Sequence, residues 1–123
     1  CHDDAQITHL GNLTLTSRIS GAKQCIDCHD NEDCAEELAS WQEATKDMLG
    51  ELGPALAELE KALQSSKAST EQLAEAKKLT GSARTKFDIV LKDGSFGAHN
   101  VGYVMEILDK VLEEIDTGQS LLE

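Results

Sequence analysis

The chain has 123 residues, of which 40% are hydrophobic, 3% are aromatic and 28% are charged. This length suits one domain, and the apolar runs are too short for a membrane-spanning helix. The 23 acidic residues outnumber the 11 basic ones, so the net charge of −12 disfavours nucleic-acid binding and makes a basic protein the better-matched partner.

The first part of the chain differs in composition from the rest. It contains all four cysteines, which are Cys1, Cys25, Cys28 and Cys34, and three of the four histidines. Residues 8–19 partly alternate between apolar and polar types, which favours a short strand or an extended segment with a turn at Gly11 and Asn12. Residues 1–33 hold no Trp, Phe or Tyr. We therefore expect an irregular segment that depends on a bound cofactor for apolar surface.

Helical periodicity begins at Asp33. Apolar residues then recur at steps of three and four as far as Leu63, which indicates one face of a helix. Pro54 lies inside this stretch, and a proline in a helix interior costs about 3 kcal/mol. We therefore expect either a kink near Gly50 or two helices end to end.

Two more helices are predicted, over residues 70–93 and about 100–115. Ser69 or Thr70 caps the former, and the tail from Thr117 should fray. Because the connections are short, neighbouring helices should be antiparallel. The expected fold is mainly α: residues 1–33 form the irregular segment, and residues 34–123 form a domain with a helical hairpin plus a third helix.

The sharpest chemical signal is the sequence Cys25-Ile26-Asp27-Cys28-His29. It is a Cys-x-x-Cys-His motif, which attaches c-type haem. Each thiol adds to one vinyl group of the porphyrin, and His29 is then held beneath the iron as its proximal ligand. Because haem c is attached outside the cytoplasm, the motif also predicts a periplasmic or other extracytoplasmic location.

Two other interpretations of these cysteines remain open. Cys25, Cys28 and Cys34 could bind zinc together with His29 as a Cys₃His site. The second interpretation is a thioredoxin-like redox pair, although the sequence lacks the βαβ pattern that such a pair needs. Cys34 otherwise reads as a small buried residue at a helix start or as a free thiol.

The pair Cys1-His2 looks like the end of a second haem motif. Its alternatives are a lipid-modified first cysteine and an arbitrary boundary. If the haem interpretation holds, the chain contacts two haems, and its four histidines supply two axial ligands to each iron. His2 and His29 would then be proximal ligands, and His9 and His99 would be distal ones.

The role of His99 is open on pattern alone. It directly precedes Asn100, which is a good helix N-cap, so a surface or capping histidine is as consistent as a ligand. Met48 and Met105 are weaker candidates for iron ligation, because both lie on apolar helix faces and are predicted to be core residues.

The sequence from Ser95 to Asn100, Ser-Phe-Gly-Ala-His-Asn, resembles the C-terminal Ser-x-Gly-x-His-Asn segment of multihaem cytochromes c. The family includes pentahaem nitrite reductases and octahaem hydroxylamine oxidoreductase-like proteins. Their last Cys-x-x-Cys-His is likewise followed by long helices and a His-Asn at a helix start. The resemblance implies that His99 is a distal haem ligand. The catalytic haem of that family lies upstream of such a region, so no catalytic residue is assigned here.

Four acidic residues surround the haem motif, namely Asp27, Asp30, Glu32 and Asp33. They read as a solvated loop, or as charges that lower the reduction potential and steer a basic redox partner. The leucine- and alanine-rich helix faces predict a modest core. We therefore expect haem to complete it near Cys34, Phe96 and His99, and a partner helix to cover Leu56–Leu63.

These observations predict electron transfer through bis-histidine haem c, as the C-terminal part of a multihaem cytochrome c. The first alternative is part of a multihaem oxidoreductase that acts on nitrogen or sulfur oxyanions, and the second is a zinc-stabilised helical interaction module. The expected partners are a redox protein or another haem-bearing subunit or chain segment, and a second copy bound through the C-terminal helices.

Overall fold

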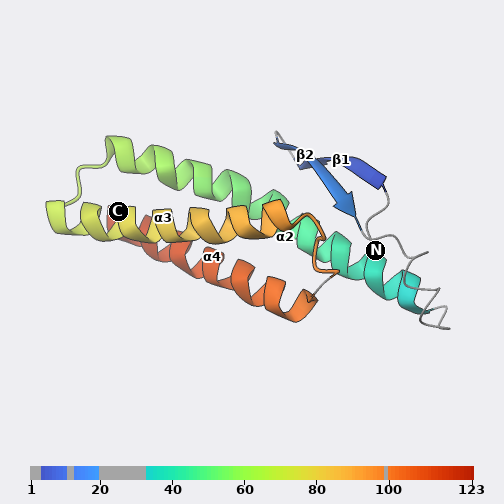
Figure 1. The fold of residues 1–123 in the computed structure, drawn as a ribbon. Helices are drawn as coiled ribbons and strands as arrows, with labels where there is room; N and C mark the ends of the chain where they lie inside the picture. Colours follow the sequence, from blue (N-terminus) through green and yellow to red (C-terminus); the bar gives the residue numbers. More distant parts are fainter. Residues whose placement is uncertain (1–3, 11–12, 20–32, 99) are drawn as a thin grey trace.

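The computed structural model describes residues 4–10, 13–19, 33–98 and 100–123. In these ranges the elements are β1 (Asp4–Leu10), β2 (Leu13–Ile19), α2 (Asp33–Ser65), α3 (Thr70–Asp93) and α4 (Val101–Leu122). The chain runs along α2, returns along α3 and runs forward again along α4, so α3 is antiparallel to both other helices (Figure 1). The prediction of a mainly helical fold with a hairpin and a third helix is confirmed.

The described part of the N-terminal segment consists of two paired strands. Strands β1 and β2 pair antiparallel from Asp4 opposite Ile19 to Leu10 opposite Leu13. The pairing satisfies those backbone N–H and C=O groups that face the partner strand, which stabilises the two extended stretches against each other. Within residues 8–19, where we expected a short strand or an extended segment, the structure has the end of β1 and all of β2. The predicted haem-binding stretch after β2 lies outside the described residues. β1 contacts α2, and β2 contacts α3.

Helix α2 runs from Asp33 to Ser65 as one helix of 33 residues, with Pro54 inside it. Of the two alternatives that we expected, two helices end to end is therefore wrong. The loss caused by proline is about 3 kcal/mol. Four leucines on the same helix, Leu49, Leu52, Leu56 and Leu59, are at most 4% exposed, and burying a leucine contributes about 1.5–3 kcal/mol. Packing along this face outweighs the local cost at Pro54.

The ends of α3 follow the sequence prediction. The Ser69 hydroxyl accepts a hydrogen bond from the backbone N–H of Gln72 at 3.2 Å, and the Gln72 side chain accepts one from the N–H of Ser69 at 3.0 Å. This reciprocal arrangement is a capping box. At the other end Gly94 adopts a left-handed conformation with φ 66°, which glycine allows without steric cost.

Helix α4 is longer than predicted, because its last turns pack instead of fraying. Gly118 is buried against Leu59 of α2. Leu122 packs against the core, and its carbonyl lies 3.5 Å from the Ser66 hydroxyl. The ends of α2 and α4 therefore lie together.

The core lies between the three helices. It consists of Leu49, Leu52, Leu56, Leu59, Ala83, Phe87, Val90, Phe96, Val104, Leu108, Val111 and Ile115. Met48 and Met105 pack against it, as predicted. The expectation that a partner helix covers Leu56–Leu63 is wrong for Leu56 and Leu59, which are 0% exposed within the single chain.

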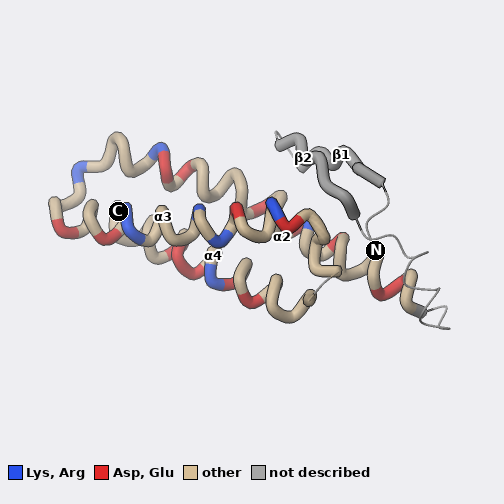
Figure 2. Tube along the Cα trace, viewed as in Figure 1, with Lys and Arg blue, Asp and Glu red and all other residues tan. Residues whose placement is uncertain are grey.

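Charged side chains recur along the three helices (Figure 2), and some of them join one helix to another. Arg84 of α3 donates two hydrogen bonds of 2.8 Å to the Glu60 carboxylate of α2. Lys86 of α3 pairs with Glu114 of α4 at 2.6 Å. None of the helices described here is long and apolar enough to cross a membrane.

Candidate functional site

Most of the predicted haem-binding residues lie outside the described part of the chain. These are Cys1, His2, Cys25, Cys28, His29 and His99. The backbone of His9 lies in β1, opposite Thr14. Cys34 is a half-buried free thiol in the first turn of α2. The structure describes the residues on both sides of position 99, and they show how the chain is held there.

The loop after α3 leads to His99 and has an unusual backbone. Phe96 and Gly97 have positive φ values of 51° and 87°, in addition to that of Gly94. A non-glycine residue with positive φ costs roughly 1–2 kcal/mol. The Phe96 side chain is 0% exposed, and its burial, worth about 1.5–3 kcal/mol, offsets that cost.

Hydrogen bonds within the loop stabilise this conformation. The Asp93 carboxylate accepts hydrogen bonds from the backbone N–H of Ser95, at 3.2 Å, and from the Ser95 hydroxyl. The Ser95 carbonyl accepts one from the N–H of Ala98 at 3.2 Å. The serine of the Ser-x-Gly-x-His-Asn sequence thus organises the turn that precedes His99.

Three side chains of α2 also contact this loop. The Gln42 side chain donates a hydrogen bond of 3.2 Å to the Ser95 carbonyl. A Cβ on Gly97 would lie 2.9 Å from the Thr45 hydroxyl oxygen, and the φ of 87° also favours glycine there. The Lys46 ammonium lies 4.9 Å from the centre of the Phe96 ring, a distance at which cation and ring attract.

The chain is also held on the C-terminal side of His99. The Asn100 side chain caps α4 by accepting a hydrogen bond of 3.1 Å from the backbone N–H of Tyr103. The sequence predicted Asn100 as a cap, whereas it gave no sign of Gln42, Thr45 or Lys46. These residues lie about 50 positions from the loop, and none belongs to a motif.

The described flanks are compatible with a bound haem. Helix α2 starts at Asp33, shortly after the Cys-x-x-Cys-His motif, and Trp41 near its start is 36% exposed. This indole offers apolar surface of the kind that a porphyrin contacts. Cys25, Cys28, His29 and His99 are the thiols and imidazoles that haem c requires. In the described ranges, no three His, Cys, Asp or Glu residues are grouped closely enough to hold a metal ion.

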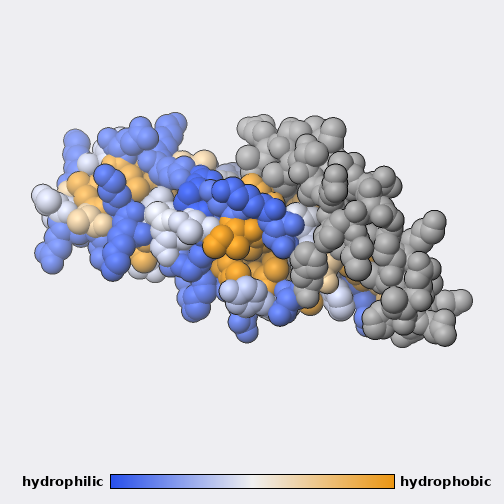
Figure 3. Space-filling view, viewed as in Figure 1, coloured by the Kyte–Doolittle hydropathy of each residue, from blue (hydrophilic) through white to orange (hydrophobic). Residues whose placement is uncertain are grey.

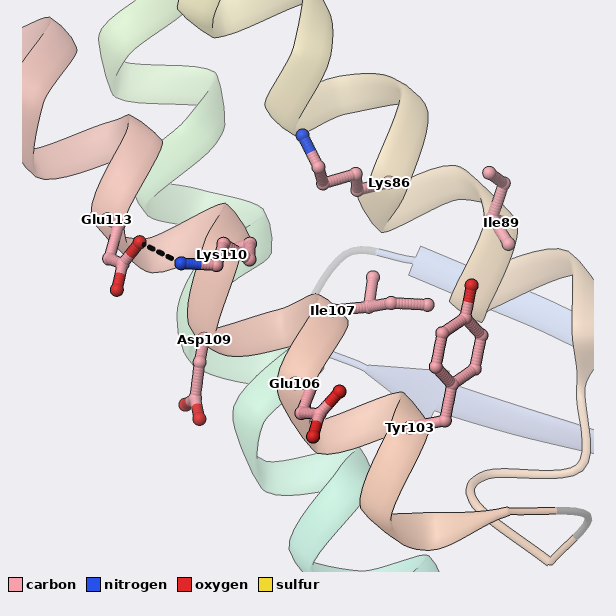
Figure 4. A pocket seen from close by; sticks show the side chains of 8 residues that line it. All are labelled: Lys86, Ile89, Tyr103, Glu106, Ile107, Asp109, Lys110 and Glu113. Carbon is pink, nitrogen blue, oxygen red and sulfur yellow. Dashed lines mark hydrogen bonds and ion pairs between the residues drawn. The ribbon is translucent and has the colours of Figure 1, made fainter.

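A surface groove of about 490 Å³ lies elsewhere, between α3 and α4. Figure 3 shows the apolar area between the two helices, bordered by hydrophilic side chains. In Figure 4, Ile89, Tyr103 and Ile107 gather at one end of the groove. Lys110 pairs with Glu113 at 2.7 Å, and this hydrogen bond raises the pKa of Lys110. The acidic residues that line the groove, Glu106, Asp109 and Glu113, are exposed and are not grouped closely enough to hold a metal ion, so we assign the groove no catalytic role.

Comparison with known proteins gives one weak relationship. No protein family matches the chain. The dissimilatory sulfite reductase MccA of Wolinella succinogenes is 25% identical to it over 105 residues, which are 85% of this chain. The chain spans 15% of the length of that relative. An identity this low indicates a distant relationship and does not establish a family.

Proposed function

We propose that the chain is the C-terminal part of a multihaem c-type cytochrome, and that it transfers electrons through haem with two histidine ligands. The observation that carries the proposal is the Cys25-x-x-Cys28-His29 motif shortly before a long helix. The fixed loop and the helix cap on either side of His99 support it, because an axial ligand must be held in one place.

Each predicted residue has a defined part in this proposal. Cys25 and Cys28 form the thioether bonds, His29 is the proximal ligand and His99 is a distal ligand. Cys1 and His2 belong to a second haem motif, and His9 is the remaining distal ligand. When bound, haem c supplies one-electron redox chemistry. Two histidines on one iron close it to substrates, so such a haem passes electrons and does not bind small molecules.

Acidic residues near the motif and the net charge of −12 define the expected partner. Negative charge beside the iron favours the ferric state and lowers the reduction potential. It also speeds the encounter with a basic redox protein. A periplasmic or other extracytoplasmic location follows from the site of haem c attachment. Residues 1–33 would form the haem-binding segment, and residues 34–123 the helical domain.

A second candidate is that the chain belongs to a larger reductase of sulfur oxyanions. The similarity to a dissimilatory sulfite reductase over 85% of the chain favours it. The chain spans only 15% of that relative, so an open catalytic iron would lie in another part of the longer protein. This candidate is compatible with the first, because a reductase of this kind needs electron-transfer haems.

The test is to express the full chain in cells that mature c-type cytochromes, and to measure its intact mass after acid–acetone extraction. We expect the extracted protein to retain the haem mass. Before extraction, the folded protein should show the optical spectrum of low-spin, bis-histidine iron. The variant Cys25→Ser/Cys28→Ser is the control and should lose that haem. Haem that extracts from the wild-type chain, or stoichiometric zinc in its place, would contradict the proposal.

A further inference from the structure

We propose that Gln42 and Thr45 of α2 are positioning residues that hold the loop of residues 94–98 so that His99 stays on the haem iron. The inference rests on the proposed function, because it takes His99 as a distal ligand. It goes further by naming the residues of the helical domain that hold this ligand in position. No such role is visible in the sequence around either residue.

The first contact fixes the start of the loop. The Ser95 carbonyl accepts one hydrogen bond from the Gln42 side chain and another from the N–H of Ala98, both at 3.2 Å. A carbonyl oxygen has two lone pairs, and both are used here. The orientation of the peptide plane after Ser95 is therefore set jointly by α2 and by the loop itself.

The second contact fixes the end of the loop. Thr45 is 0% exposed, and its hydroxyl oxygen lies 2.9 Å from the place that a Cβ on Gly97 would take. That oxygen has no hydrogen-bond partner among the described residues. An unpaired buried hydroxyl is unfavourable, so Thr45 contributes to this contact through its shape. It sets how closely Gly97, two residues before His99, approaches α2.

The two contacts act together because of their spacing. Gln42 and Thr45 are three positions apart on one helix, and such residues share a face. They meet the loop at Ser95 and at Gly97, which flank the buried Phe96 in the sequence. With the cap at Asn100 on the other side, a change at either contact should shift position 99 relative to α4.

Four variants of the full haem-bearing chain test this inference. Gln42→Met removes the hydrogen-bond donor at nearly constant volume. Gly97→Ala introduces the Cβ that Thr45 excludes, and adding Thr45→Ala to it removes that contact. Gln64→Met is the matched control, because Gln64 is an exposed glutamine on the same helix. The measurements are the high-spin fraction of the optical spectrum and the fraction of ferrous haem that binds carbon monoxide.

We expect Gln42→Met to raise the equilibrium ratio of detached to bound His99 roughly three- to tenfold, which is the effect of losing one hydrogen bond. Gly97→Ala should raise the ratio further, and the added Thr45→Ala should recover part of the loss. Gln64→Met should match the wild-type chain. The circular dichroism spectrum should stay helical in all four, because Gln42 is half-exposed and the bundle core is unchanged.

The outcomes separate this inference from the proposed function. Covalent low-spin haem in the wild-type chain, with Gln42→Met and Gly97→Ala indistinguishable from Gln64→Met, would overturn the positioning role alone. A Gly97→Ala defect that Thr45→Ala leaves unchanged would overturn the part assigned to Thr45. A wild-type chain without covalent haem would overturn both proposals.

Discussion

Leu59 occupies the space that a side chain at position 118 would need. A Cβ built on Gly118 would lie 2.9 Å from one terminal methyl carbon of Leu59 and 3.4 Å from the other. Leu59 is 0% exposed, so it has little room to move aside. This contact brings α2 and α4 together near their C-terminal ends, and it explains why α4 continues past the point where the sequence predicted fraying.

Replacing Gly118 by alanine should therefore destabilise the fold. Overpacking a core typically costs about 1–3 kcal/mol, which exceeds the gain of roughly 0.5–1 kcal/mol that alanine brings to a helix interior. Gly81→Ala is the control, because a Cβ there meets nothing within 4 Å. It should stabilise the protein. Urea unfolding of both variants checks this, and equal stabilisation by the two would rule out the tight contact.

The Arg84–Glu60 pair should contribute a small and nearly pH-independent stabilisation. The pKa of Arg84 is raised, first by its side-chain hydrogen bond to Glu60 and then by the Glu60 charge, against partial burial. A raised pKa stabilises the fold below the unfolded-state value, and this contribution is lost only as the pH rises through the folded-state value. For arginine that window lies in strong alkali.

Arg84→Met should accordingly lower the free energy of unfolding by roughly 0.2–1 kcal/mol, since both side chains are more than one third exposed. The loss should stay constant between about pH 6 and 9. Lys78→Met is the control, because Lys78 pairs with Glu75 at 3.6 Å and is 76% exposed. A loss that changes steeply across this range would point to another titrating group.

The two proposed ligands should respond differently to substitution. His29→Ala alters the attachment motif itself, so it should reduce the yield of covalent haem. His99→Ala should leave both thioether bonds intact and open one iron position, because it removes only the distal ligand. Intact mass and carbon monoxide difference spectra separate the two effects. An unchanged low-spin spectrum in His99→Ala would remove that residue from the ligand set.

The buried core also predicts how the chain behaves without haem. Phe87, Leu56, Leu59 and Leu108 are each 0% exposed within one chain, and burial of each contributes about 1.5–3 kcal/mol. The variant Cys25→Ser/Cys28→Ser should therefore retain three packed helices and melt in one transition that does not depend on protein concentration. Broad, concentration-dependent melting followed by circular dichroism would restore the expectation that haem and a partner helix complete the core.

The sequence predicted correctly those features of the fold that depend on interactions between neighbouring residues. The Ser69 cap, the end of α3 at Gly94 and the Asn100 cap depend on residues within a few positions of each other, so their signals are readable. The continuity of α2 through Pro54 depends on leucines packed against other helices, and the length of α4 depends on Leu59. Neither contact is visible in a single stretch of sequence.

The same limit applies to the candidate site. The Cys25-x-x-Cys28-His29 motif is contiguous, and its chemistry fixes its spacing. The residues that hold the loop before His99 are different in kind, because Gln42 and Ser95 are 53 positions apart. Their partnership follows only from the way α2 packs beside the end of α3. A motif can identify a ligand, whereas the residues that hold the ligand in position are brought to it by the tertiary fold.

Helix α2 begins beyond the ends of the other two helices (Figure 1). Gln42 and Thr45, through their contacts with Ser95 and Gly97, lie where it enters the bundle. The helix should therefore contain a boundary between local and global opening. In hydrogen exchange, amides before Gln42 should exchange by fraying, and those after Thr45 only when the whole bundle unfolds. A substitution deep in the bundle, such as Leu108→Ala, would then speed exchange on one side of this boundary and leave the other side unchanged.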